Sequence, residues 1–337
     1  MRRSAICRKA SATSASASFR PSRDSPVSTR RRGRSSASRT ISRSRSRPSA
    51  HETMSAMNLV LALLEVILLG TGYPRPDPAR AAASNAIVIG NKWFVVDAGR
   101  GATMRIAATD LNYANLKAVF LTHLHSDHTS GLPDLFDTSW QFGRKSVPLE
   151  LYGPPGTKKL ADAMLQFFAE DIHLRRDLLE KHPAAGATIR THIVKEGVVY
   201  DDGDVKVTAF AVDHKPVPYA FGYRFDSHGE SIVISGDTRP NANLIRYAKG
   251  ADVLVLEAYL PEHFDKVDTP EVAARLKSYH TSAEEAGEIA AAANVKTLVL
   301  THLIPGNADE TFRERAARKF KGKIVVGRDL VKIAAPD

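Results

Sequence analysis

The chain has only one cysteine, Cys7, among its 337 residues. A single cysteine cannot form a disulfide bond within the chain, and the residues that follow it offer no thiolate as a nucleophile or metal ligand. This absence excludes cysteine-based catalysis and cysteine-based metal binding in the remainder of the protein. It also fits a reducing compartment, so we expect a cytoplasmic protein.

Long apolar runs are also lacking. The longest, residues 59–69, is interrupted by Glu65 and is shorter than the roughly 20 residues that a membrane-spanning helix needs. No small-residue cleavage site of a signal peptide follows it. We therefore expect no stable membrane insertion, and we predict a first buried strand at residues 65–69. The turn Gly70-Thr71-Gly72 is not a dinucleotide-binding fingerprint, because prolines follow it where a helix would have to begin.

Acidic residues are scarce in residues 1–57, which contain 14 Lys and Arg but only Asp24 and Glu52 as acids. This segment therefore has a formal charge of +12. Because the whole chain has a formal charge of +10, the remaining residues sum to −2. Its Ser/Arg/Ala-rich composition predicts a disordered N-terminal extension, followed by one domain over residues 58–337. Three explanations stay open: a true start at Met54 or Met57, a basic arm that binds RNA, or a targeting segment.

The domain itself alternates between short apolar runs, turns and amphipathic stretches. We predict a hairpin of residues 86–89 and 93–96, and helices at residues 131–142, 157–170 and 282–292. The further predicted strands are residues 118–121, 205–212, 221–225, 232–234, 253–256, 299–300 and 323–326. Hairpins come first and strand–helix alternation follows, which favours a mixed α/β sandwich over a purely parallel sheet.

Chemistry is concentrated in His123-Leu124-His125-Ser126-Asp127-His128, directly after a predicted strand. Side chains at positions i and i+2 of an extended segment lie on one side, so His123 and His125 can converge on one metal ion. A tight turn after them can bring Asp127 and His128 to a second ion. Imidazole and carboxylate ligands suit zinc, with manganese or iron as alternatives.

A centre with two metal ions needs further ligands. His214, Asp237 and His302 each follow a predicted apolar strand, where a rigid element can aim the side chain into one cleft. Taken alone, each is more often a structural residue. Their joint pattern with the His-rich segment indicates a binuclear site.

The pattern His-x-His-x-Asp-His, followed by His214, Asp237 and His302, resembles the metallo-β-lactamase superfamily over roughly residues 65–330. The resemblance implies the αββα four-layer sandwich. It further implies two divalent ions, one held by His123, His125 and His214 and the other by Asp127, His128 and His302. Asp237 would bridge both ions.

Several stretches are similar to ribonuclease Z and to its arylsulfatase-type relatives. These are Asp213-His214 with Phe221-Gly222-Tyr223-Arg224, then Ser235-Gly236-Asp237-Thr238-Arg239-Pro240, Leu256-Glu257-Ala258 and His280-Thr281-Ser282. The resemblance implies that His280, Asp127 and Glu257 are the catalytic residues, with His280 as general acid and Glu257 orienting it. Ordinary polarity near a strand end and a helix start is the alternative for Glu257 and His280. Asp213 is a candidate carboxylate behind the metal ligands.

The chain also departs from ribonuclease Z. Leu256 replaces the His of the His-Glu-Ala element, and Leu303-Ile304-Pro305-Gly306 replaces the aromatic/serine/arginine element after the last ligand. We find no Gly/Pro-rich arm of the kind that grips tRNA, and the domain has no net basic charge. These differences argue against tRNA as the substrate and leave the hydrolytic chemistry intact.

The leading hypothesis is a ribonuclease Z-like phosphodiesterase that uses a metal-bridged hydroxide, with RNA, a cyclic nucleotide or a smaller diester as substrate. The alternatives are an arylsulfatase-type sulfate-ester hydrolase and an RNA-binding protein with a vestigial metal site. Relatives often form homodimers, although the sequence carries no interface signature. Specificity depends on predicted loops at residues 138–147, 167–176 and 259–277, and Trp140 and Tyr219 line either the cleft or the core.

Overall fold

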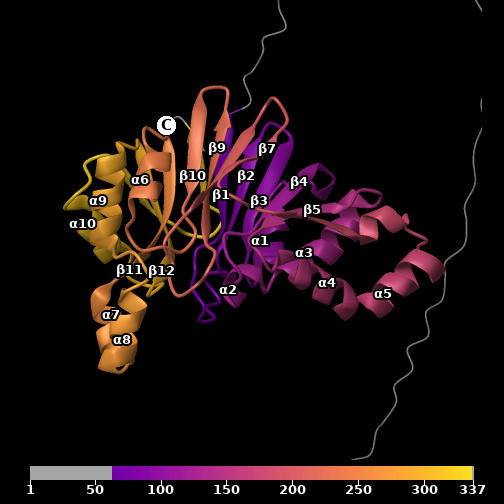
Figure 1. Cartoon of the computed structure of the whole chain (residues 1–337), viewed down its shortest axis with the longest axis horizontal. Coiled ribbons are helices and arrows are strands. Elements are labelled where there is room, and N and C mark those ends of the chain that lie inside the picture. Colours follow the sequence, from indigo (N-terminus) through magenta and orange to yellow (C-terminus); the bar gives the residue numbers. More distant parts are fainter. Residues whose placement is uncertain (1–62, 336–337) are drawn as a thin grey trace, which may run out of the picture. The chain divides into compact units, whose positions relative to one another are not determined.

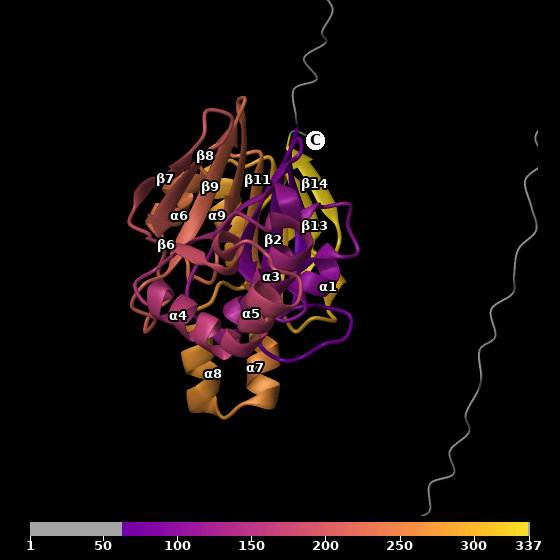
Figure 2. The same cartoon turned by 90° about the vertical axis from the view of Figure 1, so that its right-hand side faces the viewer.

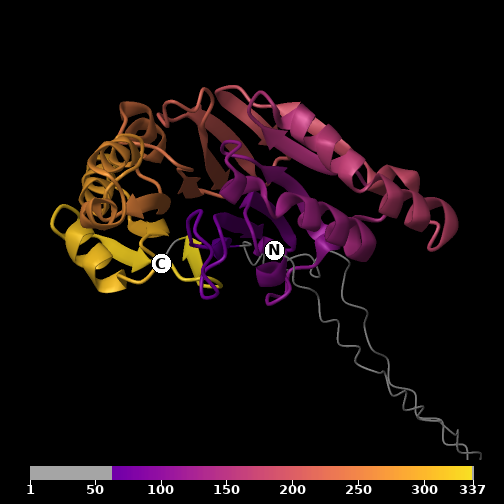
Figure 3. The same cartoon turned by 90° about the horizontal axis from the view of Figure 1, so that it is seen from below.

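A computed structural model of the protein describes residues 63–335, and the predicted extension over residues 1–57 lies outside this range. Two seven-stranded sheets pack face to face, and helices cover their outer faces (Figures 1 and 3). The predicted α/β four-layer sandwich is confirmed.

The first sheet is antiparallel at one edge and parallel at the other. Its first four strands in spatial order pair antiparallel, and parallel pairing begins between β3 and β4. The order is β14 (Lys332–Ala335), β1 (Leu64–Gly70), β2 (Ser84–Ile89), β3 (Lys92–Ala98), β4 (Leu116–Phe120), β5 (Leu149–Gly153) and β6 (Ile189–Ile193). The predicted hairpin of β2 and β3 is confirmed.

The second sheet has the same mixed character. Strands β7 to β10 pair antiparallel, and β10 to β13 pair parallel. Its order is β13 (Lys323–Val326), β12 (Thr297–Ile304), β11 (Val253–Tyr259), β10 (Glu230–Ile234), β9 (Phe221–Ser227), β8 (Lys206–Ala211) and β7 (Gly197–Asp201). Parallel pairing requires crossover connections, which the helices between these strands provide.

The core lies in three layers. Val66 and Leu68 of β1 face the space between the sheets, whereas Ile67 and Leu69 face the helices outside. Because both faces of β1 are buried after Glu65, residues 66–69 are continuously apolar instead of alternating. Between the sheets, Tyr223 donates its hydroxyl proton to the carbonyl of Leu121 over 2.7 Å and joins β9 to the end of β4.

The outer helices divide between the sheets. Contacts with the first sheet come from α1 (Ala102–Ile106), α3 (Leu132–Ser139) and α4 (Thr157–Phe167), and α5 (Ala169–His173) packs against α4 (Figure 2). The second sheet contacts α6 (Ala242–Ala248), α9 (Ala283–Ala293) and α10 (Asp309–Ala317). Helix α9 begins with a capping box, in which Ser282 and Glu285 bond each other's backbone amides.

Two predicted helices are shorter than expected. Helix α3 ends at Ser139 and continues as one π-helical turn (Trp140–Arg144), and α4 ends at Phe167 before α5 begins. Within the part of the chain that the structure describes, no helix is long and apolar enough to cross a membrane.

Residues 259–277, predicted as a loop, contain a helical hairpin. It consists of α7 (Pro261–Val267) and α8 (Pro270–Lys277), which project from one end of the sheets (Figures 1 and 2). Both helices begin with proline, and Thr269 caps α8 by accepting from the amide of Val272. Proline is favoured at the first helical position, so Pro261 and Pro270 initiate the two helices of this hairpin.

Candidate metal centre

The His-rich segment lies where the first sheet meets the second. Strand β4 ends at Phe120, His125 precedes the single-turn helix α2 (Ser126–Thr129), and Asp127 and His128 lie on that turn. His214 follows β8 and Asp237 follows β10, as predicted. His302 instead lies inside β12, with a left-handed backbone (φ +47°) that non-glycine residues adopt infrequently.

One group of candidate ligands joins both sheets: His123, His125, His214 and Asp237. His123 Nε2 lies 3.0 Å from His125 Nδ1, which is 3.4 Å from His214 Nε2. Asp237 Oδ2 is 3.9 Å from both His123 Nε2 and His214 Nε2. Three imidazole nitrogens and one carboxylate therefore surround one point.

A second group consists of Asp127, His128 and His302. Asp127 Oδ2 lies 3.1 Å from His302 Nε2 and 3.6 Å from His128 Nε2. Asp237 approaches this group as well, with Oδ1 3.3 Å from His128 Nε2 and Oδ2 3.5 Å from His302 Nε2. Asp237 thus lies between the two groups.

The arrangement of these atoms fits bound divalent cations. His128 Nε2 is buried and makes no hydrogen bond, although Asp237 Oδ1 is close to it. The nitrogens of His123, His125 and His214 face one another, where an ion between their lone pairs would stabilise them. An imidazole and carboxylate donor set of this kind is typical of zinc, and also of manganese or iron sites.

Burial keeps the first group in the form that binds metal. Burial lowers the pKa values of His123, His125 and His214, so these imidazoles are neutral near neutral pH. A neutral imidazole has the free nitrogen lone pair that a metal ligand requires.

The carboxylates carry the negative charge of the site. Burial opposes ionisation of Asp237 and Asp127, but neighbouring imidazoles outweigh it. His302 and His128 hold the pKa of Asp237 well below its usual range, and the hydrogen bond from His302 lowers the pKa of Asp127 to about 2. Burial also opposes protonation of His128 and His302, whose pKa values Asp237 nevertheless raises. The buried carboxylates therefore attract positive charge to this point.

Asp97, which no sequence motif identified, supports the His-rich segment from behind. Its carboxylate lies 2.8 Å from His128 Nδ1 and accepts from the amide (2.8 Å) and hydroxyl (2.7 Å) of Thr122. The Thr122 hydroxyl is also 3.0 Å from His123 Nδ1. Asp97 thereby orients two candidate ligands. It directly follows an apolar strand segment, which is the same signal that identified His214 and Asp237.

Glu257 and His280 form a buried pair beside Asp237. Their atoms Oε2 and Nδ1 are 2.6 Å apart, and Glu257 Oε1 accepts from the amide of Thr238 over 2.5 Å. Burial, followed by the charge of Asp237, raises the pKa of Glu257 well above its usual value, whereas burial lowers that of His280. Because Nδ1 of His280 is engaged by Glu257, Nε2 is the ring nitrogen that remains available on the side of the cleft.

These two residues also belong to a third group of converging ligand atoms, which consists of Asp237, Glu257, His280 and His302. His280 Nδ1 lies 4.0 Å from Asp237 Oδ2, and His302 Nδ1 lies 3.9 Å from Glu257 Oε2. The geometry therefore offers Glu257 and His280 a ligand role besides the catalytic one.

A backbone carbonyl, and not the side chain of Asp213, supports the ring of His214. Asp213 accepts from Arg239 Nη2 over 2.7 Å, instead of bonding a histidine ring. The second nitrogen of His214 faces the carbonyl of Tyr279 over 2.9 Å, so backbone of the α8–α9 connection orients this ring.

A cleft of about 360 Å³ opens on the candidate ligands. Besides His125, Asp127, Asp237, His280 and His302, it is lined by Tyr73, Pro74, Arg75, His263, Phe264, Asp268, Leu276, Tyr279 and Ile304. Neither Trp140 nor Tyr219 is among these residues. Trp140 is fully buried in the core beneath α3, so its core interpretation is correct, and Tyr219 is half exposed elsewhere on the surface.

Comparison with protein families matches residues 92–303 to the beta-lactamase superfamily domain. The ribonuclease Z of Mycobacterium bovis (strain BCG / Pasteur 1173P2) is 39% identical over 280 residues, which cover 80% of this chain and 98% of that protein. The ribonuclease Z of Mycobacterium sp. (strain KMS) is 40% identical over 277 residues and is covered to 96%.

Solved structures agree on the fold. Human tRNase Z, short form, superposes with a TM-score of 0.61 at 24% identity, covering 81% of this chain and 100% of that one. The metallo-beta-lactamase fold protein YhfI from Bacillus subtilis gives a TM-score of 0.64 at 20% identity, with the same coverage.

Proposed function

We propose that this chain, which belongs to the beta-lactamase superfamily as a relative of ribonuclease Z, cleaves RNA at a centre of two zinc ions. Its family makes it a metal-dependent hydrolase of phosphodiester bonds. The observation that carries this proposal is the convergence of seven candidate ligands from both sheets around Asp237. RNA is the substrate class that the names of its relatives suggest.

In this proposal His123, His125 and His214 hold one ion, and Asp127, His128 and His302 hold the other. The position of Asp237 between the groups supports a bridging role. Bound cations of this kind supply Lewis acidity and activate water for attack on phosphorus.

The protein's own contribution to bond cleavage is the pair of Glu257 and His280. We assign them to proton transfer, and not to metal binding, because they already satisfy each other over 2.6 Å. Glu257 fixes the tautomer and orientation of His280, whose Nε2 can donate a proton to the leaving oxygen.

The test is a parallel assay of the purified protein. Two forms of RNA, a tRNA precursor and a short single strand, are compared with a cyclic nucleotide, bis(p-nitrophenyl) phosphate and an aryl sulfate, and elemental analysis measures the bound metal. We expect close to two equivalents of zinc, hydrolysis of the RNA and of the phosphodiester, and loss of both activities on chelation. A preference for the aryl sulfate would contradict the proposal, and so would a protein that binds no metal.

We further propose that residues 58–337 form the hydrolase domain and that residues 1–57 are not needed for catalysis. All candidate ligands lie between His123 and His302, which supports this division. A chain that begins at Asn58 should keep the kcat for bis(p-nitrophenyl) phosphate, whereas its loss would place an essential part of the domain upstream. The mass of the same preparations in solution tests for a homodimer.

A further inference from the structure

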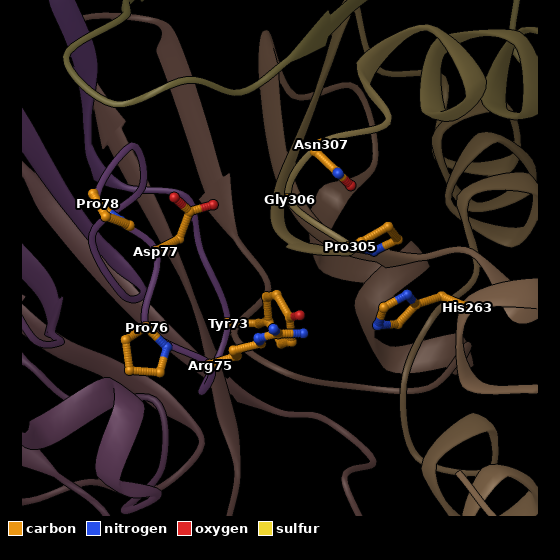
Figure 4. Close-up of a pocket in the computed structure, with 9 residues that line it drawn as sticks. All are labelled: Tyr73, Arg75, Pro76, Asp77, Pro78, His263, Pro305, Gly306 and Asn307. Atoms are coloured by element: carbon orange, nitrogen blue, oxygen red, sulfur yellow. The ribbon is translucent and has the colours of Figure 1, made fainter. Parts of the chain in front are cut away.

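A second cavity of about 420 Å³ lies next to the metal centre, and Figure 4 shows the residues that line it. Its size is within the roughly 300–1,000 Å³ of small-molecule sites. Tyr73, Arg75 and His263 line both this cavity and the cleft over the candidate ligands, so the two hollows are neighbours. None of the residues that line the cavity is a candidate metal ligand. The cavity is therefore distinct from the metal centre and lies beside it.

Two aromatic rings stand where the hollows meet. The rings of Tyr73 and His263 contact edge to face, with centroids 6.4 Å apart and planes at 86°. Tyr73 packs against the buried cluster of Tyr259, Phe264, Ala273 and Ile304, which fixes its position. Burial, with a contribution from the Arg75 guanidinium, lowers the pKa of His263, so its ring is neutral. Together the rings provide an uncharged aromatic surface.

The polar groups of the cavity are divided along its length. Arg75 is exposed, makes no hydrogen bond or ion pair with the residues of 63–335, and lines both hollows. Asp77 and Asn307 line the second cavity but not the cleft, and they lie away from Arg75 in Figure 4. Positive charge thus faces the reaction centre, while a carboxylate and an amide lie farther from it.

The walls of the cavity are held together by Arg80. Its Nε donates to the carbonyl of Gly306 (2.6 Å), and its Nη1 donates to Thr71 Oγ1 (2.8 Å) and to the carbonyl of Gly327 (2.6 Å). Its Nη2 pairs with Asp309 Oδ1 over 2.7 Å. The segment after β1 and the segment after β12 are therefore fixed relative to each other, so a ligand would not have to order them.

We infer that this cavity, the Tyr73 subsite, binds the nucleobase of a nucleotide that adjoins the scissile phosphate. The base stacks on the face of Tyr73 and meets the ring of His263 edge to face. Arg75 contacts the backbone phosphate, and Asn307 and Asp77 face the polar edge of the base. This inference rests on the proposed phosphodiesterase function and adds how the substrate is held. A substrate without a base would leave both the aromatic surface and the amide unused.

The test uses short RNA substrates with an abasic nucleotide immediately 5′ or immediately 3′ of the scissile bond. In the parent protein, one of the two abasic substrates should have a kcat/KM lower by roughly 5- to 100-fold, the range for one stacked base. Tyr73→Ala should lower kcat/KM for the intact RNA similarly and remove its discrimination against that abasic substrate. Tyr73→Phe should restore both the kcat/KM for the intact RNA and the discrimination against the abasic substrate. Phe142→Ala removes an exposed ring far from the cavity and serves as the matched control.

Because Tyr73 also packs on buried residues, its replacement can affect folding. The same comparison is therefore repeated with His263→Ala and His263→Phe, which change the second aromatic ring of the cavity. The parent's activity on bis(p-nitrophenyl) phosphate reports separately on the proposed function. If the parent cleaves RNA but tolerates both abasic substrates equally well, the Tyr73 subsite is refuted while the phosphodiesterase stands. Discrimination that survives both alanine substitutions would likewise overturn the inference.

Discussion

His280 is the residue on which proton transfer should depend. Its Nδ1 is engaged by Glu257 at 2.6 Å, so Nε2 is the nitrogen available to the leaving group. We expect His280→Ala to lower kcat by roughly 10²- to 10⁴-fold, the usual contribution of general acid catalysis. Steady-state kinetics on bis(p-nitrophenyl) phosphate, with elemental analysis of the same sample, measures both effects.

The metal content decides between the two roles that the geometry offers His280. A general acid can be removed without loss of metal, so the variant should retain the zinc of the parent. A variant that loses an equivalent would instead make His280 a ligand in the group with Asp237, Glu257 and His302.

Asp97 should matter through the ligands it orients. Asp97→Asn keeps the size of the side chain but weakens the bonds to His128 and Thr122, so we expect the affinity for zinc to fall by roughly 10- to 100-fold. Competition with a chromophoric chelator measures this change. Asp213→Asn is the matched control, because Asp213 pairs with Arg239 and bonds no candidate ligand. Equal affinities of the parent and the Asp97 variant would show that this carboxylate is dispensable.

For single residues, residue type and spacing were enough to select the candidate metal ligands that the structure brings together. His214 and Asp237 could be found because each follows an apolar strand. Asp97 lies near the end of β3, after the apolar residues 93–96, but no motif accompanies it, and its role depends on the pairing of β3 with β4. The partnership of Glu257 with His280 depends likewise on tertiary pairing, because these residues are far apart in sequence.

Among the elements, the turn that carries Asp127 depends on close packing at Gly99. A Cβ atom at Gly99 would lie 2.2 Å from the Asp127 carbonyl oxygen, so this backbone must shift when a side chain is added. We expect Gly99→Ala to lower the free energy of unfolding by about 1–3 kcal/mol, as overpacking does, and to reduce the zinc content. Denaturant melts and elemental analysis give the two values.

The control for this change is Gly203→Ala, at a turn with positive φ (+87°) and no neighbouring atoms. It should also cost stability through backbone strain, by roughly 1 kcal/mol, but leave the zinc content unchanged. If both variants retain their metal equally, the packing at Gly99 does not position the turn.

Elements differed in how well the sequence predicted them. Strands β10 and β11 contain the buried apolar runs 232–234 and 253–256, which the sequence pattern identifies. Strands β6 and β7 lie at sheet edges with only partly buried side chains, so they carry little hydrophobic pattern and were missed. The hairpin of α7 and α8 was missed because Pro261 and Pro270 are compatible with loops as well as with helix starts.

For the whole molecule, buried tyrosines predict a loss of stability at high pH. Burial raises the pKa values of Tyr113, Tyr200 and Tyr259 to about 12, and that of Tyr223 well above its usual value. In the unfolded chain these groups titrate near pH 10. Their stabilising effect is therefore complete below about pH 10 and is lost as the pH rises toward 12, because the unfolded state releases protons that the folded state retains.

Urea melts between pH 8 and pH 11.5 test this dependence. Above about pH 10, a fully buried tyrosine such as Tyr223 should reduce the free energy of unfolding by about 1.4 kcal/mol per pH unit. Tyr223→Phe should make the decline less steep, although it also removes the hydrogen bond to Leu121. A decline of the same steepness in the variant would assign the alkaline effect to other groups.

The pairing of β14 with β1 has a consequence for how the protein is made. Leu64 pairs with Ala335, so the free edge of β1, an early strand of the described chain, is covered only by β14, the last strand. Until synthesis reaches that point, β1 presents unpaired backbone groups and apolar side chains to the surroundings. Folding of the first sheet is thus completed only after translation of the domain, and in that interval the nascent protein depends on whatever protects exposed strands from aggregation in the cell.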